Sequence, residues 1–106
     1  MSKQEQIPDL GQTEAIILGV LLSSAGSEMY GLEILAGSAG LLKRGSLYVT
    51  LQRMEDKKLV ESRQEVRPKP EVGIPRRLYS VTGLGDQAFE RYRSTHQKMQ
   101  ELFATA

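Results

Sequence analysis

Residues 43–55 (KRGSLYVTLQRME) carry the pattern that most constrains the fold of this chain. Leu47, Leu51 and Met54 recur at spacings of four and three, so they share one side of a helix. The opposite side carries amide, guanidinium, phenol and methyl groups. Two basic residues, Lys43 and Arg44, open this stretch, and Ser46 is expected to cap the helix start. The pattern predicts an amphipathic helix that buries one stripe and presents a polar face.

Two further helices are expected before this one. The first is capped by Thr13 and continues through residues 15–22, which are apolar nearly all round, so it should lie at the centre of the core. Residues 23–27 end it, and a shorter helix follows at about residues 30–36. A glycine-bearing turn at residues 37–40 then leads into the amphipathic helix. This order predicts a helix-turn-helix arrangement.

The residues after the amphipathic helix alternate in polarity, as strands do. Residues 59–67 and 76–82 both show this alternation, and residues 68–75 between them contain three prolines and a glycine. Two strands joined by a proline-rich loop form a hairpin, which we interpret as the wing of a winged helix.

A last helix is expected over residues 84–103, with Thr82 as its cap. Its apolar positions recur at spacings of four and three, which is typical of a helix that packs against a partner helix. A dimer interface is therefore expected, and packing back on its own domain is the alternative. The expected interface residues are Ile16, Val20, Ala88, Tyr92, Thr95, Met99, Leu102 and Phe103.

These elements define a mainly α fold with a small β-hairpin: a winged helix-turn-helix plus a long C-terminal helix. We expect a flexible N-terminal tail at residues 1–10, a winged helix-turn-helix domain at residues 11–82 and a dimerisation helix at residues 83–106. The absence of cysteine excludes disulfides and thiolate zinc sites. The longest apolar run, residues 15–22, is too short to span a membrane, and the polar N-terminus is unlike a signal peptide, so a cytoplasmic location is expected.

Charge is distributed unevenly along the chain. The net charge is only +1, but residues 43–77 hold ten basic residues against five acidic ones. Such a local excess suits binding to phosphates, and a solvated charged surface is the alternative. We interpret the amphipathic helix as one that enters a DNA major groove, with Gln52 pairing with adenine and Arg53 with guanine. The expected DNA contacts are Tyr30, Lys43, Arg44, Ser46, Tyr48, Val49, Gln52, Arg53, Lys69, Arg76 and Arg77. For Tyr48, stacking on the hairpin is an equally open alternative.

Several segments, in this order, resemble the PadR family of bacterial transcriptional regulators. They are Leu18–Leu22, Tyr30–Ile34, Gly45–Tyr48, Leu51–Glu55, Leu59–Ser62 and Arg76–Thr82. The resemblance covers about residues 14–92, and the single C-terminal helix is similar to the compact subgroup. It implies a homodimer that represses transcription, and in some members DNA is released when a small phenolic or drug-like molecule binds. The chain departs from the family at Leu32, where tyrosine is common, and at Arg44 and Val49, where proline is common.

No residue pattern favours an enzyme or a cofactor site. Residues 83–88 fit G-x-G-x-x-A, but no second strand follows, so a dinucleotide site is not expected and Gly85 is interpreted as a small residue where helix meets hairpin. Glu55 and Asp56 are interpreted as solvated charge. His96 is the only histidine, so no metal site is expected within one chain.

We therefore expect a sequence-specific DNA-binding regulator, a repressor that acts as a homodimer on a near-palindromic operator. Its expected partners are double-stranded DNA and a second copy of the chain. A small apolar or phenolic effector could occupy a cleft lined by Ile16, Val20, Tyr92, Met99 and Phe103, for which ordinary dimer packing is the alternative. The alternative function is a winged helix that binds a protein and not DNA.

Overall fold

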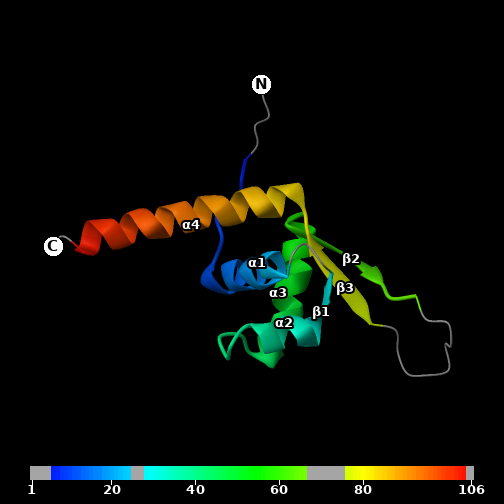
Figure 1. Ribbon diagram of the computed structural model, residues 1–106. Helices are drawn as coiled ribbons and strands as arrows, with labels where there is room; N and C mark the ends of the chain where they lie inside the picture. The colour runs from blue at the N-terminus through cyan, green and yellow to red at the C-terminus, as the bar shows by residue number, and fades with distance from the viewer. Residues whose placement is uncertain (1–5, 25–27, 67–75, 105–106) are drawn as a thin grey trace.

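The computed structural model describes residues 6–24, 28–66 and 76–104. Helices surround a small sheet, and the long last helix extends away from the body on the side opposite the hairpin (Figure 1). This is the predicted mainly α fold with a wing. In chain order the elements are α1 (Gln12–Ser23), β1 (Met29–Tyr30), α2 (Gly31–Gly37), α3 (Arg44–Asp56), β2 (Val60–Gln64), β3 (Arg77–Val81) and α4 (Gly83–Ala104).

The sheet has one strand more than the predicted hairpin. Its antiparallel order is β1-β3-β2, with Tyr30 opposite Leu78 and Ser62 opposite Tyr79. Strand β1 is only two residues long, so it is too short to leave an alternating pattern in the sequence. It matters for the site because it brings Tyr30 and the start of α2 against the wing.

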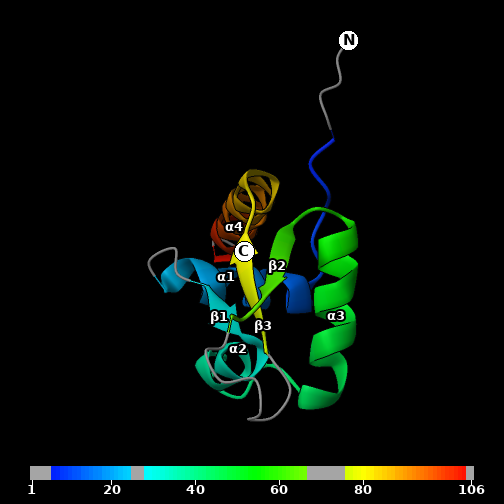
Figure 2. The same ribbon diagram turned by 90° about the vertical axis from the view of Figure 1, so that its right-hand side faces the viewer.

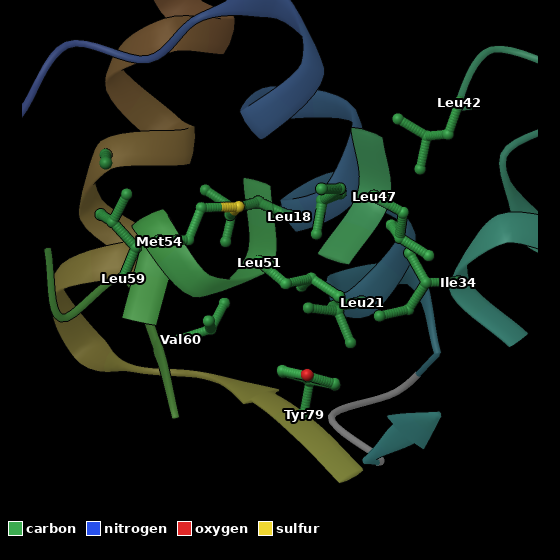
Figure 3. Close-up of a cluster of buried hydrophobic side chains, with 12 residues drawn as sticks. Leu18, Leu21, Ile34, Leu42, Leu47, Leu51, Met54, Leu59, Val60 and Tyr79 are labelled. Atoms are coloured by element: carbon green, nitrogen blue, oxygen red, sulfur yellow. The ribbon is translucent and has the colours of Figure 1, made fainter. Parts of the chain in front are cut away.

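The core forms around α1, as the sequence predicted. Ile17, Leu18 and Leu21 of α1 are at most 1% exposed, and the α3 stripe facing them is fully buried. Figure 3 shows the α1 and α3 side chains pointing toward each other, with Tyr79 closing the cluster from β3. Complete burial of one such side chain stabilises the fold by roughly 1.5–3 kcal/mol. The predicted stripe therefore fixes which face of α3 remains outside.

Two predicted helix caps are wrong. Helix α1 begins after Gly11, whose backbone N–H donates to Glu14 Oε1 at 2.9 Å, so Thr13 lies inside the first turn. Helix α3 begins after Lys43, and the Ser46 hydroxyl instead donates to the Lys43 carbonyl at 3.4 Å. Burial of Leu42 anchors the chain directly before α3, so the helix starts earlier than Ser46 would require.

The cap of α4 is confirmed. The backbone N–H of Gly85 donates to Thr82 Oγ1 at 3.0 Å. Gly85 packs so close to the Leu59 carbonyl that a side chain would overlap it, which also confirms the structural interpretation of this glycine. The first half of α4 covers α1, where Phe89 lies against Gly19. From Arg93 to Ala104 the side chains of the helix are exposed.

The described part of the expected N-terminal tail, residues 6–10, lies against the domain. Ile7 and Leu10 pack on the core, and Arg91 of α4 donates to the Ile7 carbonyl at 3.1 Å. The segment therefore bridges α1 and α4. Among the described residues, no helix combines the length and apolar character needed to cross a lipid bilayer.

Candidate nucleic-acid interface

The polar face of α3 is exposed along its whole length. Figure 2 shows α3 on one side of the molecule, with its outer flank clear of the other elements. Tyr48 is 47% and Val49 54% exposed, although both lie within one turn of fully buried leucines. The predicted contacts on this helix and its N-cap are all exposed: Lys43, Arg44, Ser46, Tyr48, Val49, Gln52 and Arg53. The recognition surface is therefore presented to the outside of the protomer.

The two expected base-reading residues leave α3 in different directions. Gln52 lies on the outer face and its Nε2 donates to Asp56 Oδ1 at 3.1 Å. Arg53 lies on the flank toward the start of α1, where it lines a shallow pocket with Gln12 and Thr50. Successive residues of a helix diverge by about 100°, so the pair spans a wide arc of the surface. Gln52 lies nearer than Arg53 to the middle of the exposed face of α3.

Tyr48 packs against α2. A Cβ at Gly31 would lie 2.5 Å from the Tyr48 hydroxyl, so the ring fits only because residue 31 has no side chain. Tyr48 also borders a pocket of about 370 Å³ that Tyr30, Arg76 and Arg77 line as well. Four of the expected phosphate contacts, which come from β1, α3 and the wing, thus lie around one pocket. The Tyr48 ring therefore lies over the start of α2, beside the hairpin.

Arg76 and Arg77 leave the wing on opposite faces, because successive side chains of a strand alternate. The Arg76 guanidinium lies 4.4 Å above the Tyr30 ring, and its Nε is 3.8 Å from Glu65 Oε1. Arg77 lies on the face toward α3, and its Nε donates to Ser62 Oγ at 3.0 Å. Arg77 is therefore the wing arginine directed toward the recognition helix.

Sequence reasoning missed two residues of this site, Glu55 and Ser62. Glu55 was interpreted as solvated charge, but it is half-buried and accepts a hydrogen bond of 2.8 Å from the Ser62 hydroxyl. Burial raises the pKa of Tyr79, the negative charge of Glu55 raises it further, and the positive charge of Arg77 opposes this shift. The sequence does show a polar residue, Ser62, at a position of β2 whose side chain faces the core side of the hairpin. Its partner Glu55 on α3 follows only from the packing of the helix against the hairpin.

Ion pairs neutralise part of the basic excess between residues 43 and 77. Arg63 donates two hydrogen bonds to Glu28, at 2.6 and 2.7 Å, and these lower the pKa of the Glu28 carboxyl. Lys57 pairs with Glu14 at 2.7 Å. By contrast, Lys43, Arg44 and Arg53 form no ion pair with any residue that the structure describes. These three cations lie on α3 and at its N-terminal end.

The expected dimer residues fall into two groups. Met99, Leu102 and Phe103 are 42%, 67% and 65% exposed near the end of α4. Ile16, Val20 and Tyr92 line a groove of about 540 Å³ between α1, the α2–α3 turn and α4.

Two of the expected dimer residues differ from these groups. Ala88 is only 1% exposed, so it packs inside its own protomer and is removed from the expected interface. Thr95 is exposed beside the N-terminal segment.

Lys69, the remaining expected DNA contact, lies outside the described residues.

The structure also bears on metal binding and on His96. Within the described ranges no group of histidine, aspartate and glutamate side chains is placed to hold a metal ion. His96 stacks on Tyr92 with ring centroids 4.1 Å apart, so it belongs to the groove that borders α4.

Comparison with solved structures shows a winged-helix fold. A PadR family transcription regulator from Clostridium difficile is 24% identical with a TM-score of 0.75, covering 90% of this chain and 97% of that one. A PadR-like transcriptional regulator from Bacillus cereus is 24% identical with a TM-score of 0.68, covering 88% of each chain. Bacillus subtilis PadR in complex with operator DNA is 20% identical with a TM-score of 0.63, covering 76% of this chain and 46% of that one.

Sequence comparison assigns the family. The sequence matches no curated protein. The family of PadR-like transcriptional regulators, whose members are regulators of transcription and not enzymes, matches residues 17–91. This match spans most of the chain and includes the helix-turn-helix, the wing and the start of α4. The chain therefore belongs to the PadR-like family of transcriptional regulators.

Proposed function

We propose that the protein is a sequence-specific DNA-binding regulator that represses transcription as a homodimer on a near-palindromic operator. The observation that carries this proposal is the exposed polar face of α3 together with Lys43, Arg44 and Arg53, which form no ion pair with a described residue. The operator-bound PadR of Bacillus subtilis has the same fold, which supports the use of this face for DNA. The place of action is then the bacterial cytoplasm.

In this proposal α3 enters the major groove. Gln52 exchanges its hydrogen bond with Asp56 for the edge of an adenine, while Arg53 pairs with a guanine. Val49 contacts a thymine methyl group. Phosphates are bound by the surrounding residues, which fix the register without reading sequence; these are Tyr30, Lys43, Arg44, Ser46, Tyr48, Lys69, Arg76 and Arg77.

The end of α4 supports the dimer. Met99, Leu102 and Phe103 are exposed apolar residues near the end of α4. This end of the helix projects beyond the body of the protomer (Figure 1). A second copy would cover it, and the groove lined by Ile16, Val20 and Tyr92 offers a matching apolar surface. Two-fold symmetry then presents both α3 helices to successive major grooves, about 34 Å apart.

A small apolar or phenolic effector is part of the same proposal. The groove of about 540 Å³ lies within the size range of small-molecule sites. A molecule bound there would change how the two α4 helices meet, and hence the spacing of the α3 helices. Release of DNA on addition of such compounds to the complex is the expected result.

The test is capture of genomic fragments by the purified protein, followed by titration of one captured duplex at rising salt. Neutralisation of several phosphates predicts that affinity falls by about 10³–10⁵ between roughly 50 and 200 mM salt. The matched control is the variant with Lys43 and Arg44 replaced by alanine, for which the slope should be shallower. No retention of duplex DNA even at low salt would refute the proposal and leave a protein-binding winged helix.

A further inference from the structure

Side chains from three elements form a continuous hydrogen-bonded chain between the recognition helix and the wing. The Ser62 hydroxyl of β2 donates to Glu55 Oε2 of α3 at 2.8 Å, and Arg77 Nε of β3 donates to the same hydroxyl at 3.0 Å. A serine hydroxyl has one proton to donate and lone pairs to accept, so both bonds form at once. The Ser62 hydroxyl therefore both donates and accepts a hydrogen bond.

The sheet register explains why these three residues meet. Ser62 lies opposite Tyr79, on the face of the hairpin that is turned toward α3, and Arg77 shares that face two residues earlier in β3. Glu55 is half-buried below them near the end of α3. Tyr79 senses both charges, since Glu55 raises its pKa and Arg77 lowers it. The hairpin and α3 are therefore joined by polar groups as well as by the core.

The bond to Ser62 uses only the Nε–H of Arg77. The two terminal amino groups of a guanidinium lie in the same plane as the Nε–H and donate along its other edges. Toward the residues that the structure describes, Arg77 uses none of these other donors, so they can bind a phosphate. An exposed arginine has considerable rotamer entropy, part of which is lost when it contacts a ligand. Holding the side chain in place beforehand removes part of that loss from the free energy of binding.

We propose that Ser62 and Glu55 are positioning residues, which aim Arg77 at the DNA backbone and make the wing and α3 grip the duplex as one unit. This inference rests on the proposed function, because it assigns Arg77 a phosphate. Neither residue touches DNA itself. Arg76 provides an internal contrast, since Tyr30 and Glu65 hold it on the other face of the hairpin, independently of Ser62.

The experiment compares Ser62→Val with Ser62→Thr. The two substituted side chains have nearly the same shape, and only threonine keeps the hydroxyl. Binding to a fluorescent duplex of mixed sequence is measured by anisotropy over a salt series, because phosphate contacts do not require a particular operator. Ser62→Val should weaken binding about three- to tenfold per subunit, whereas Ser62→Thr should bind with wild-type affinity. Glu55→Gln should fall between them.

A second measurement separates positioning from general structural damage. In the Arg77→Ala background, Ser62→Val should have no further effect on affinity, whereas in the Arg76→Ala background its effect should remain whole. Ser62→Val should also reduce the slope of log affinity against log salt, but by less than Arg77→Ala does, because Arg77 keeps its charge and loses only its fixed position.

Two outcomes would overturn the inference. One is wild-type affinity and slope for Ser62→Val when Arg77→Ala binds weakly. The other is an additive effect of the two substitutions. If the wild-type protein does not bind the duplex at any salt concentration, the proposed function itself fails, so the two failures are distinguishable.

Discussion

The phenol ring of Tyr48 lies directly over Gly31, so that α3 and α2 are in contact where no other side chain intervenes. A Cβ at residue 31 would be 2.5 Å from the Tyr48 hydroxyl and 2.6 Å from Cε1. This contact sets the position of Tyr48 near the start of the recognition helix. It also places the hydroxyl beside Tyr30 and the wing arginines, where the proposed DNA backbone passes.

Gly31→Ala is expected to displace Tyr48 without unfolding the protein. Tyr48 is half exposed and its ring has room to turn outward, while alanine in a helix gains roughly 0.5–1 kcal/mol over glycine. The net change in unfolding free energy should stay below about 1 kcal/mol. DNA affinity should fall by roughly 0.5–1.5 kcal/mol, as for Tyr48→Phe, because both variants lose the proposed hydrogen bond from the Tyr48 hydroxyl to a phosphate. Wild-type affinity for Gly31→Ala alone would show that the position of Tyr48 is unimportant.

Gly85→Ala is expected to destabilise the fold. The added methyl group would overlap the Leu59 carbonyl and lie 2.9 Å from Val81 Cγ1, and a backbone carbonyl cannot move aside easily. Overpacking of this kind costs about 1–3 kcal/mol. Urea denaturation should show the loss for Gly85→Ala but not for Gly83→Ala, since a Cβ at Gly83 meets nothing within 4 Å. Equal stability of the two variants would contradict the close approach of α4 to the hairpin.

Replacing Leu102 and Phe103 together by aspartate is expected to give a monomer. Both side chains are about two-thirds exposed in the protomer, and an interface cannot bury two unpaired carboxylates without a large loss of free energy. Light scattering should report half the mass of the wild-type protein. Ser94→Asp, which adds charge to an exposed position elsewhere on α4, should remain dimeric. A dimer that survives the double substitution would mean that another surface pairs.

Arg53→Ala and Gln52→Ala are expected to change sequence preference in different ways. Loss of a bidentate contact to a base costs about 1–3 kcal/mol and relaxes preference at one base pair. Binding selections on randomised duplexes should show a relaxed guanine position for Arg53→Ala and a relaxed adenine position for Gln52→Ala. Because Arg53 lies on the flank of α3, uniform weakening on all sequences would identify it as a phosphate contact instead.

The Glu28–Arg63 pair is expected to make stability dependent on pH below neutrality. Hydrogen bonds from Arg63 lower the pKa of Glu28 from its ordinary value of 4.5. A carboxyl with a lowered folded-state pKa stabilises the fold above its unfolded pKa, and this stabilisation is lost as pH falls through the folded-state value. The difference in unfolding free energy between wild type and Glu28→Gln should therefore be constant above pH 4.5 and disappear in stronger acid. A difference in unfolding free energy that persists in strong acid would contradict a stabilising role for the ionised Glu28–Arg63 pair.

Much of the fold was predictable because hydrophobic spacing reports local geometry directly. The stripe of Leu47, Leu51 and Met54 fixed which side of α3 is buried, and hence which side is exposed. The apolar run of α1 placed that helix at the centre. The cap at Thr82 was also correct, because the hydroxyl bonds to a backbone only three residues away.

The sequence therefore determined the order of the elements, the buried and exposed faces of α3, and the family. Only the tertiary structure decided which residues act together. The starts of α1 and α3 depended on where Glu14 and Leu42 pack, and Ala88 was removed from the expected interface by burial within its own protomer. The sheet register puts Ser62 and Arg77 on one face of the hairpin, and the packing of α3 against that face brings Glu55 to Ser62. Such contacts depend on distances between separate elements, which no local pattern of residues encodes.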